Sequence, residues 1–209
     1  MTFGLVKHNN NSLSAITTAG QLAQGKMTLI KEQTASSSSS ISFVHGSSDV
    51  VLDSTYPIYV FKFINIHSAN DEVSFEFNLS EDVGSNYNVS KTTTFFNGEH
   101  NENDATARLE YRTGKDLANG TGNQTINFSQ GNDNDQSSSG ELILFNPSDT
   151  TFVTHFMSRS SIVADGDYVR DAFVAGYANL TSAIDAIKFT MSSGNIDSGT
   201  IKLYGIKGS

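Results

Sequence analysis

The segment YPIYVFKFINIHSANDEVSFEFNLS, residues 56–80, decides the fold class of this chain. Its first half places Tyr59, Phe61 and Phe63 at alternate positions, and the positions between them are apolar except for Lys62. An extended segment with two apolar faces is typical of a central strand that is buried on both sides. The first half therefore predicts a β-strand at the centre of a sheet.

The second half alternates strictly between apolar and polar residues from position 73 to position 80. Such alternation predicts a strand with one face on the core and the other in water. The residues expected to face the core are Val73, Phe75, Phe77 and Leu79, and those expected to face water are Ser74, Glu76, Asn78 and Ser80. The link HSANDE between the two strands is polar and of hairpin length, so we predict that they form a hairpin.

Further strand-like segments follow along the chain, separated by turns rich in Asn, Gly, Asp and Ser. They cover residues 92–96, 107–111, 124–128, 141–146, 151–160, 167–177, 183–192 and 200–206. Strands at roughly ten-residue spacing with turns between them predict an all-β fold, an antiparallel β-sandwich or jelly roll. The predicted core includes Phe61, Phe63, Phe75, Phe77, Ile187, Phe189 and Leu203.

The last strand-like segment, TIKLYGI, is preceded by SSGNIDSG at residues 192–199. Glycine and asparagine tolerate the backbone conformations of tight turns, so this stretch predicts a turn. We expect the chain to close with a hairpin in which Gly194, Gly199 and Gly205 are structural turn residues.

The first 35 residues differ from the rest, because they show no sustained apolar period of 2 or 3.6 residues. We interpret residues 1–35 as an extended N-terminal arm for assembly or attachment, and residues 36–209 as one β-sandwich domain. Such an arm either frays, as termini commonly do, or lies on a neighbouring subunit.

Composition excludes several classes of protein. The chain has 209 residues, a formal net charge of −9 and no cysteine. Disulfides and thiol chemistry are therefore excluded, and nucleic-acid binding is not expected because there is no basic cluster to neutralise phosphates. No apolar run approaches the length of a membrane span, so no membrane insertion is expected, and the start of the chain does not look like a signal peptide.

Motifs for catalysis do not emerge from the sequence. The five histidines, among them His155, have no metal-ligand spacing, and neither a G-x-S-x-G elbow nor a phosphate-binding loop is present. Glu76 and Glu141 are a conceivable carboxylate pair for glycoside hydrolysis, but surface acids offer such pairs in any sandwich. We expect no enzymatic activity, no catalytic residue and no cofactor.

Two weaker binding hypotheses remain. The loop GNDNDQSSSGE has Asp133 and Asp135 at the spacing of an EF-hand start, but Ser138 stands where that loop requires glycine. Weak binding of calcium by these two aspartates stays open. Exposed tyrosines are candidates for stacking on sugars, with core or interface packing as the alternative. They are Tyr87, Tyr111, Tyr168, Tyr177 and Tyr204.

Three parts of the chain together resemble a group of virion proteins of tailed bacteriophages that is common in marine phage genomes. They are QTASSSSSISF running into DSTYPIYVFKFINIHSANDEVSFEF, then GELILFNPSD, and finally AIDAIKFTMSSGNIDSGTIKLYGI. The resemblance covers residues 36–206 with a divergent middle at 84–139, and the pattern S-G-N-I-x-S-G-T-x-x-L-Y-G-I is its most distinctive part. No catalytic residues belong to this pattern.

The resemblance implies a β-sandwich on the virion exterior, made in the bacterial host cytoplasm and assembled as a homo-oligomer, most often a trimer. The expected function is that of a non-enzymatic structural protein: a capsid decoration, a knob, or a tail or fibre adaptor attached through its arm to other virion proteins. The alternative is a tail-fibre module that recognises a host surface glycan.

Overall fold

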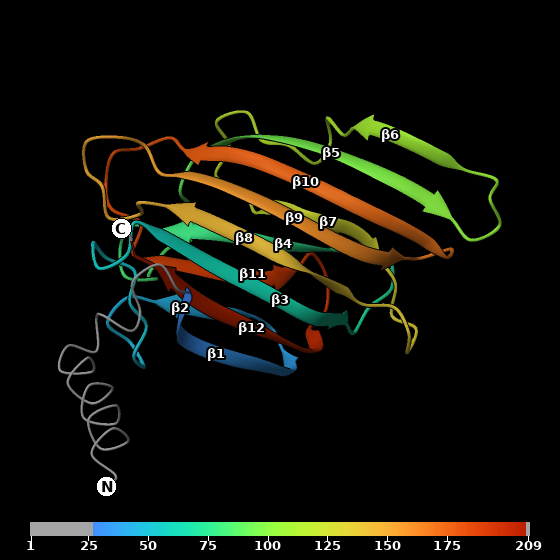
Figure 1. Cartoon of the computed structure of the whole chain (residues 1–209), viewed down its shortest axis with the longest axis horizontal. Coiled ribbons are helices and arrows are strands. Elements are labelled where there is room, and N and C mark those ends of the chain that lie inside the picture. The colour runs from blue at the N-terminus through green and yellow to red at the C-terminus, as the bar shows by residue number, and fades with distance from the viewer. Residues whose placement is uncertain (1–26, 208–209) are drawn as a thin grey trace, which may run out of the picture.

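The computed structural model describes residues 27–207 and confirms the all-β fold class (Figure 1). Every pairing between its twelve strands is antiparallel. The strands are β1 (Met27–Ser38), β2 (Ile41–Val44), β3 (Ile58–Ser68), β4 (Val73–Ser80), β5 (Lys91–Asn101), β6 (Ala107–Tyr111), β7 (Gln124–Gln130), β8 (Ser138–Phe145), β9 (His155–Ala164), β10 (Tyr168–Ala178), β11 (Ala186–Met191) and β12 (Ile196–Ile206). No helix in this part of the chain is both long and apolar enough to cross a membrane.

The strands form two packed layers. The larger layer has the order β1-β12-β3-β8-β9-β10-β5-β6, and the smaller layer has the order β7-β4-β11-β2. A single bridge between Gln130 on β7 and Ala164 on β9 joins them. In Figure 1 the eight-stranded layer faces the viewer, with β6 at the top and β1 at the bottom. The predicted antiparallel sandwich is therefore confirmed.

The core between the layers is aromatic and centred on Phe189 of β11. Its ring lies 5.5 Å from Phe61 and 5.3 Å from Phe63, both on β3 of the opposite layer. Phe77 of β4 meets Phe156 of β9 edge to face at 5.2 Å. All seven predicted core residues are buried, since the period of 2 in each strand assigns side chains to faces without knowledge of the partner strand.

The predicted hairpin of β3 and β4 is wrong. β3 pairs with β12 and β8 in the larger layer, whereas β4 pairs with β11 and β7 in the smaller one. The polar link crosses from one layer to the other, so the aromatic faces of the two strands pack against each other, with Phe63 5.2 Å from Phe75. The true hairpins include β9–β10, which turns at Asp165-Gly166-Asp167.

The predicted C-terminal hairpin is also wrong. β11 and β12 lie in different layers, and Gly194 is in the link that joins them. Gly199 and Gly205 lie inside β12 rather than in a turn. Gly199 has a φ of +118° where the register with β3 shifts, and a Cβ on Gly205 would lie 2.4 Å from the ring of Tyr56. Both positions thus require glycine for reasons other than a turn.

The sheet begins earlier than the sequence suggests. Residues 27–35, assigned to the arm by the sequence analysis, belong to β1 and pair with β12 along the edge of the larger layer. Ala35 is buried in the core. Residues 1–26, the remainder of the predicted arm, lie outside the described residues.

The polar face of β4 is covered rather than exposed to water. Ser74, Asn78 and Ser80 are all buried. The segment between β6 and β7 lies over this face, where Asn78 donates hydrogen bonds to Thr121 and Asn123 and Lys115 donates one to Ser74. The loop thus satisfies buried polar groups on the outside of the smaller layer. Among residues 27–207, none covers the outside of the larger layer in the same way.

Candidate docking face

The outer face is defined here as the side of the eight-stranded layer that is turned away from the four-stranded layer. Eleven large hydrophobic side chains of the described residues are exposed, and all except Val83 and Phe152 lie on this face. They are Met27, Leu29, Ile64, Phe96, Leu109, Tyr111, Met157, Val163 and Val169. Contiguous exposed apolar surface of this kind marks interaction sites on soluble proteins, whereas single exposed apolar residues are ordinary.

An apolar row runs across six strands of the outer face. Each of its residues is the direct cross-strand neighbour of the next, so their side chains stand side by side. The row consists of Leu29, Tyr204, Val60, Ile143, Met157 and Ala175, on β1, β12, β3, β8, β9 and β10. Met157, near the centre of the layer, is 53% exposed.

A second row, the charged–aromatic row, contains one residue from each of the eight strands. Its first five positions are charged and its last three are aromatic. In strand order they are Glu32, Lys202, Lys62, Glu141, Arg159, Phe173, Phe96 and Tyr111. Charged side chains therefore occupy five positions of the row, and aromatic rings occupy the remaining three, which form its aromatic end on β10, β5 and β6.

The middle of the charged–aromatic row is held rigidly. Arg159 donates to both carboxylate oxygens of Asp171, at 3.0 Å from Nε to Oδ1 and 2.6 Å from Nη2 to Oδ2, and this pairing raises the pKa of Arg159. Its guanidinium lies 4.9 Å from the ring centroid of Phe173. The opposite face of Phe173 stacks on Phe96 at 4.8 Å with an interplanar angle of 5°. Ion pairing and stacking together hold these side chains in one arrangement.

Two shallow hollows lie along the apolar row. One of about 300 Å³ is lined by Phe96, Ile143, Met157 and Phe173, and one of about 400 Å³ is lined by residues that include His155 and Met157. Small residues on β10 leave this space between larger neighbours. The apolar surface is therefore uneven, with concave spaces between its larger side chains.

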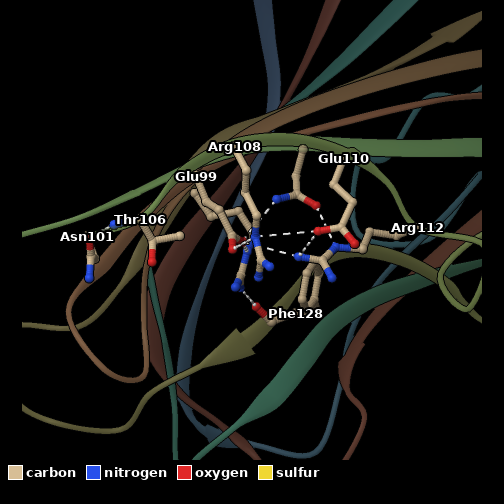
Figure 2. A network of polar contacts seen from close by, with 9 residues as sticks. Glu99, Asn101, Thr106, Arg108, Glu110, Arg112 and Phe128 are labelled. Atoms are coloured by element: carbon tan, nitrogen blue, oxygen red, sulfur yellow. Dashed lines mark hydrogen bonds and ion pairs between the residues drawn. The ribbon is translucent and has the colours of Figure 1, made fainter. Parts of the chain in front are cut away.

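A buried ionic cluster supports one end of the larger layer from its inner side (Figure 2). The carboxylate of Glu99, on β5, accepts hydrogen bonds from Arg108, from Arg112 at 3.4 Å and from Arg170 at 3.0 Å. Burial raises the pKa of Glu99, but the hydrogen bonds from Arg170 and Arg108 outweigh this and lower it. Glu99 is therefore held as a carboxylate, which suits an anchor between strands and not a proton donor.

The cluster of Glu99, Arg108, Arg112 and Arg170 is called the arginine cluster below. Arg170 connects it to the smaller layer. Its guanidinium lies 3.9 Å from the ring centroid of Phe128 on β7, and Nη1 donates to the Phe128 carbonyl oxygen at 2.6 Å. Burial lowers the pKa of Arg170. The cluster connects β5, β6, β10 and β7. It therefore stiffens the part of the larger layer that carries the aromatic end of the charged–aromatic row.

The structure separates the carboxylates considered for hydrolysis. Glu76 lies on β4 of the smaller layer, while Glu141 lies on the outer face of the larger layer and pairs with Lys62. They therefore stand on opposite sides of the sandwich and do not form a catalytic pair. His155 is exposed at the end of β9, beside Tyr177.

Asp133 and Asp135 are both exposed in the loop between β7 and β8. The main-chain oxygen of Asp133 lies 3.1 Å from Nε2 of His67. Within residues 27–207, no group of three or more His, Cys, Asp or Glu side chains is placed to hold a metal ion. Calcium binding by this loop stays a prediction.

The sequence analysis named Tyr111, Tyr177 and Tyr204 among its candidate tyrosines, and all three belong to outer-face positions. It missed the residues that dominate the face, including Phe96, Met157, Arg159 and Phe173. Their signal was present, because several strands are apolar on both alternating sets of positions. We interpreted that signal in β3 as burial on both sides, whereas residues 27–207 cover only one side.

Comparison with known proteins returned no match: no protein-family model, curated protein or solved structure is similar to this chain.

Proposed function

We propose that this chain is a non-enzymatic structural protein of a tailed-phage virion, displayed on the particle exterior as a capsid decoration, a knob, or a tail or fibre adaptor. The three sequence segments that resemble such proteins support the virion assignment. The observation that carries the docking role is the gathering of nine of the eleven exposed large hydrophobic side chains on one face.

A face of this kind is suited to docking on another protein. Its backbone is held by the hydrogen bonds of an eight-stranded layer, so little conformational entropy is lost when a partner covers it. Burial of its apolar side chains supplies the favourable free energy of association. A rigid, mostly apolar face therefore supports a role in assembly.

Attachment to the particle is assigned to the N-terminal segment. This segment, residues 1–26, enters the sandwich at Met27, which is the first residue of the edge strand β1 and lies on the outer face. Residues 27–35 are part of the sheet, so the attachment role belongs to the residues before them.

A glycan-binding tail-fibre module is the alternative function, and the geometry of the outer face favours protein docking over it. Sugars stack on a free aromatic face. Phe173 has Phe96 against one ring face and Arg159 against the other, so its ring faces are used within the chain. The aromatic end of the charged–aromatic row thus presents ring edges rather than free ring faces on which a sugar could stack.

The test is to image virions of the phage that encodes this chain after an epitope tag is inserted in the exposed β5–β6 loop, between Asn103 and Asp104. Gold-labelled antibody on the particle exterior is the expected result, with virions carrying the untagged chain as the control. Purified virions without label, when the tagged chain is expressed and folded, would contradict the proposal. Gold label confined to the tail fibres, together with binding of the purified chain to a glycan array, would favour the alternative.

A further inference from the structure

We propose that a second copy of this chain covers the outer face, related to the first by a two-fold axis that runs parallel to the strands between β8 and β9. The inference deepens the docking role proposed above, on which it rests, by naming one partner. It is drawn from the order of residues along the two rows of the outer face.

The boundary between β8 and β9 divides the larger layer into four strands on each side. A two-fold axis lying along this boundary therefore superimposes the full width of one layer on the full width of the other. It keeps each residue at its height along the strands and reverses the strand order. Each row of one copy thus meets the same row of the second copy, read backwards.

When the charged–aromatic row meets its own reverse, no two like charges oppose each other. An acid meets a base at the centre, two lysines meet two phenylalanine rings farther out, and an acid meets a tyrosine at the edge. The four pairs, each occurring twice, are Glu141 with Arg159, Lys62 with Phe173, Lys202 with Phe96, and Glu32 with Tyr111. Glu141 and Arg159 bring opposite charges together twice at the axis. Both ring faces of Phe173 are occupied by Arg159 and Phe96, and the Tyr111 hydroxyl donates to Asp116 within the chain, so the outer pairs contribute packing of the lysine stems against ring edges.

The four residues of the apolar row nearest the axis also meet their own reverse, whereas Leu29 and Tyr204 lie beyond the part of the row that is repeated on the other side. Ile143 of one copy lies opposite Met157 of the second copy at the axis. The next position sets Val60 opposite Ala175, but Val60 is only 3% exposed, so the apolar contact is centred on Ile143 and Met157. The hollow of about 300 Å³ beside Met157 provides room for these side chains to interdigitate. The centre of the pairing is therefore apolar, as in other stable protein interfaces.

Charge and area also favour a second copy. The chain has a net charge of −9, yet the charged residues on and beside the two rows of the outer face are three bases and three acids. The bases are Lys62, Lys202 and Arg159, and the acids are Glu32, Glu141 and Asp171. Two acidic chains therefore meet without net repulsion across this face. Eight strands about 4.8 Å apart, with about eight residues each, cover about 900 Å², which is comparable to the roughly 800 Å² per partner of a standard interface.

Two-fold pairing is the symmetry that uses one patch twice. A ring of three requires two different patches on each chain, whereas an isologous dimer requires a single self-complementary patch. The exposed large hydrophobic residues of the described chain form one such patch, since Val83 and Phe152 lie elsewhere. The geometry therefore points to a dimer and not to the trimer that the sequence resemblance implies.

The test measures the mass of the purified full-length chain by sedimentation equilibrium at micromolar concentration. The expected mass is about 45 kDa, twice the 22.5 kDa of one chain. Met157→Glu places a charge at the apolar centre and is expected to raise the dimer dissociation constant at least about tenfold. Phe152→Glu is the matched control, because Phe152 is 70% exposed outside the face, and this variant is expected to stay dimeric. Circular dichroism verifies that both variants are folded.

A monomer overturns the proposal and leaves the face to residues 1–26 or to a different virion protein. A trimer overturns the two-fold axis, and a dimer that survives Met157→Glu overturns the choice of face. The axis itself is tested by mixing Ile143→Cys chains with Met157→Cys chains, which carry the only thiols because the native chain has none. A short bismaleimide is expected to join the two kinds of chain, and failure to join them overturns this axis.

These measurements use purified protein and no virions, so they are independent of the imaging test of the proposed function. A dimer in solution, with no gold label on particles, would contradict the virion role and support the two-fold pairing. Gold label on particles, with a chain that is monomeric in solution, would support the virion role and contradict the two-fold pairing.

Discussion

Glu141 on β8 and Arg159 on β9 are direct cross-strand neighbours at the centre of the outer face, yet each forms its ion pair with a different residue. Glu141 pairs with Lys62, and Arg159 pairs with Asp171. An acid and a base that stand on either side of the proposed two-fold axis are the residues that meet reciprocally across it. This relationship makes the two positions sensitive reporters of pairing.

Charge reversal at either position is expected to separate the dimer. Glu141→Arg sets a new guanidinium against Arg159 of the second copy, and Arg159→Glu sets a new carboxylate against Glu141 of the second copy. Each variant alone therefore opposes like charges twice, and we expect its dimer dissociation constant to rise more than about tenfold. A one-to-one mixture of the two variants again opposes unlike charges at both places, so we expect a heterodimer that sedimentation detects.

The control for charge reversal is folding of each variant alone. The intrachain pairs that are lost are partly exposed and worth about 0–1 kcal/mol each, and each variant also sets like charges side by side at positions 141 and 159 of its own chain, so unfolding free energies are expected to fall by about 1–2 kcal/mol without loss of the fold. Mixed chains that stay monomeric, although both are folded, would show that the two residues do not meet across an axis.

Glu99→Gln is expected to destabilise the fold by roughly 3–5 kcal/mol, because it leaves buried Arg170 without a counter-charge. The measurement is the free energy of unfolding in urea. Asp104→Asn is the matched control: Asp104 also forms an ion pair, with His100, but it is highly exposed, and its loss is expected to cost less than about 0.5 kcal/mol. Equal effects of the two substitutions would argue against the arginine cluster as an anchor.

Stability is expected to rise between pH 8 and pH 10 because of Lys91. Burial lowers the pKa of Lys91 to about 8, and its Nζ donates to Asn78 and to the Val89 carbonyl oxygen. In this window the unfolded chain keeps the lysine proton while the folded chain loses it, so the unfolded state binds more protons and the free energy of unfolding increases with pH. We expect a gain of about 2 kcal/mol.

Lys91→Met isolates this contribution. The variant is expected to lose the increase between pH 8 and pH 10, although its absolute stability also changes with the lost hydrogen bonds. Above pH 10 the sign reverses in both proteins, because burial raises the pKa of Tyr59 to about 12 and the folded state then holds the extra proton. Parallel pH profiles for the two proteins would show that Lys91 is not the group responsible.

The sequence predicts faces well and strand partners poorly. Alternation assigned Phe75 and Phe77 to the core correctly, because the side-chain period of a strand is 2 whatever lies beside it. The partners of β3 and β4 were wrong, since a link of hairpin length also spans the distance between two packed layers. With β3 and β4 in different layers, their aromatic side chains pack against each other in the core. No local sequence pattern indicates that this arrangement is preferred over a hairpin.

The outer face was present in the sequence but not recognisable as a surface. β3 carries apolar residues on both sides, which is typical of a doubly buried strand, and Ile64 is nevertheless 42% exposed. A single chain does not reveal whether the second apolar side is covered by its own elements or by a partner. The arginine cluster was beyond sequence reasoning for another reason: Glu99 and Arg170 are brought together only by the pairing of β5 with β10.

Deletion of residues 1–26 separates folding from attachment. The core cluster lies between Ala35 and Leu203, and β1 begins at Met27, so the truncated chain keeps every described strand. We expect its free energy of unfolding and its dimer to match those of the full-length chain, while its incorporation into virions is lost. Deletion of residues 1–38 is the contrasting variant: it removes β1, exposes the edge of β12 and removes Ala35 from the core, so it is expected to destabilise the fold. Incorporation that survives the shorter deletion, measured by immunoblot of purified particles, would move the attachment role from the N-terminal segment to the sandwich.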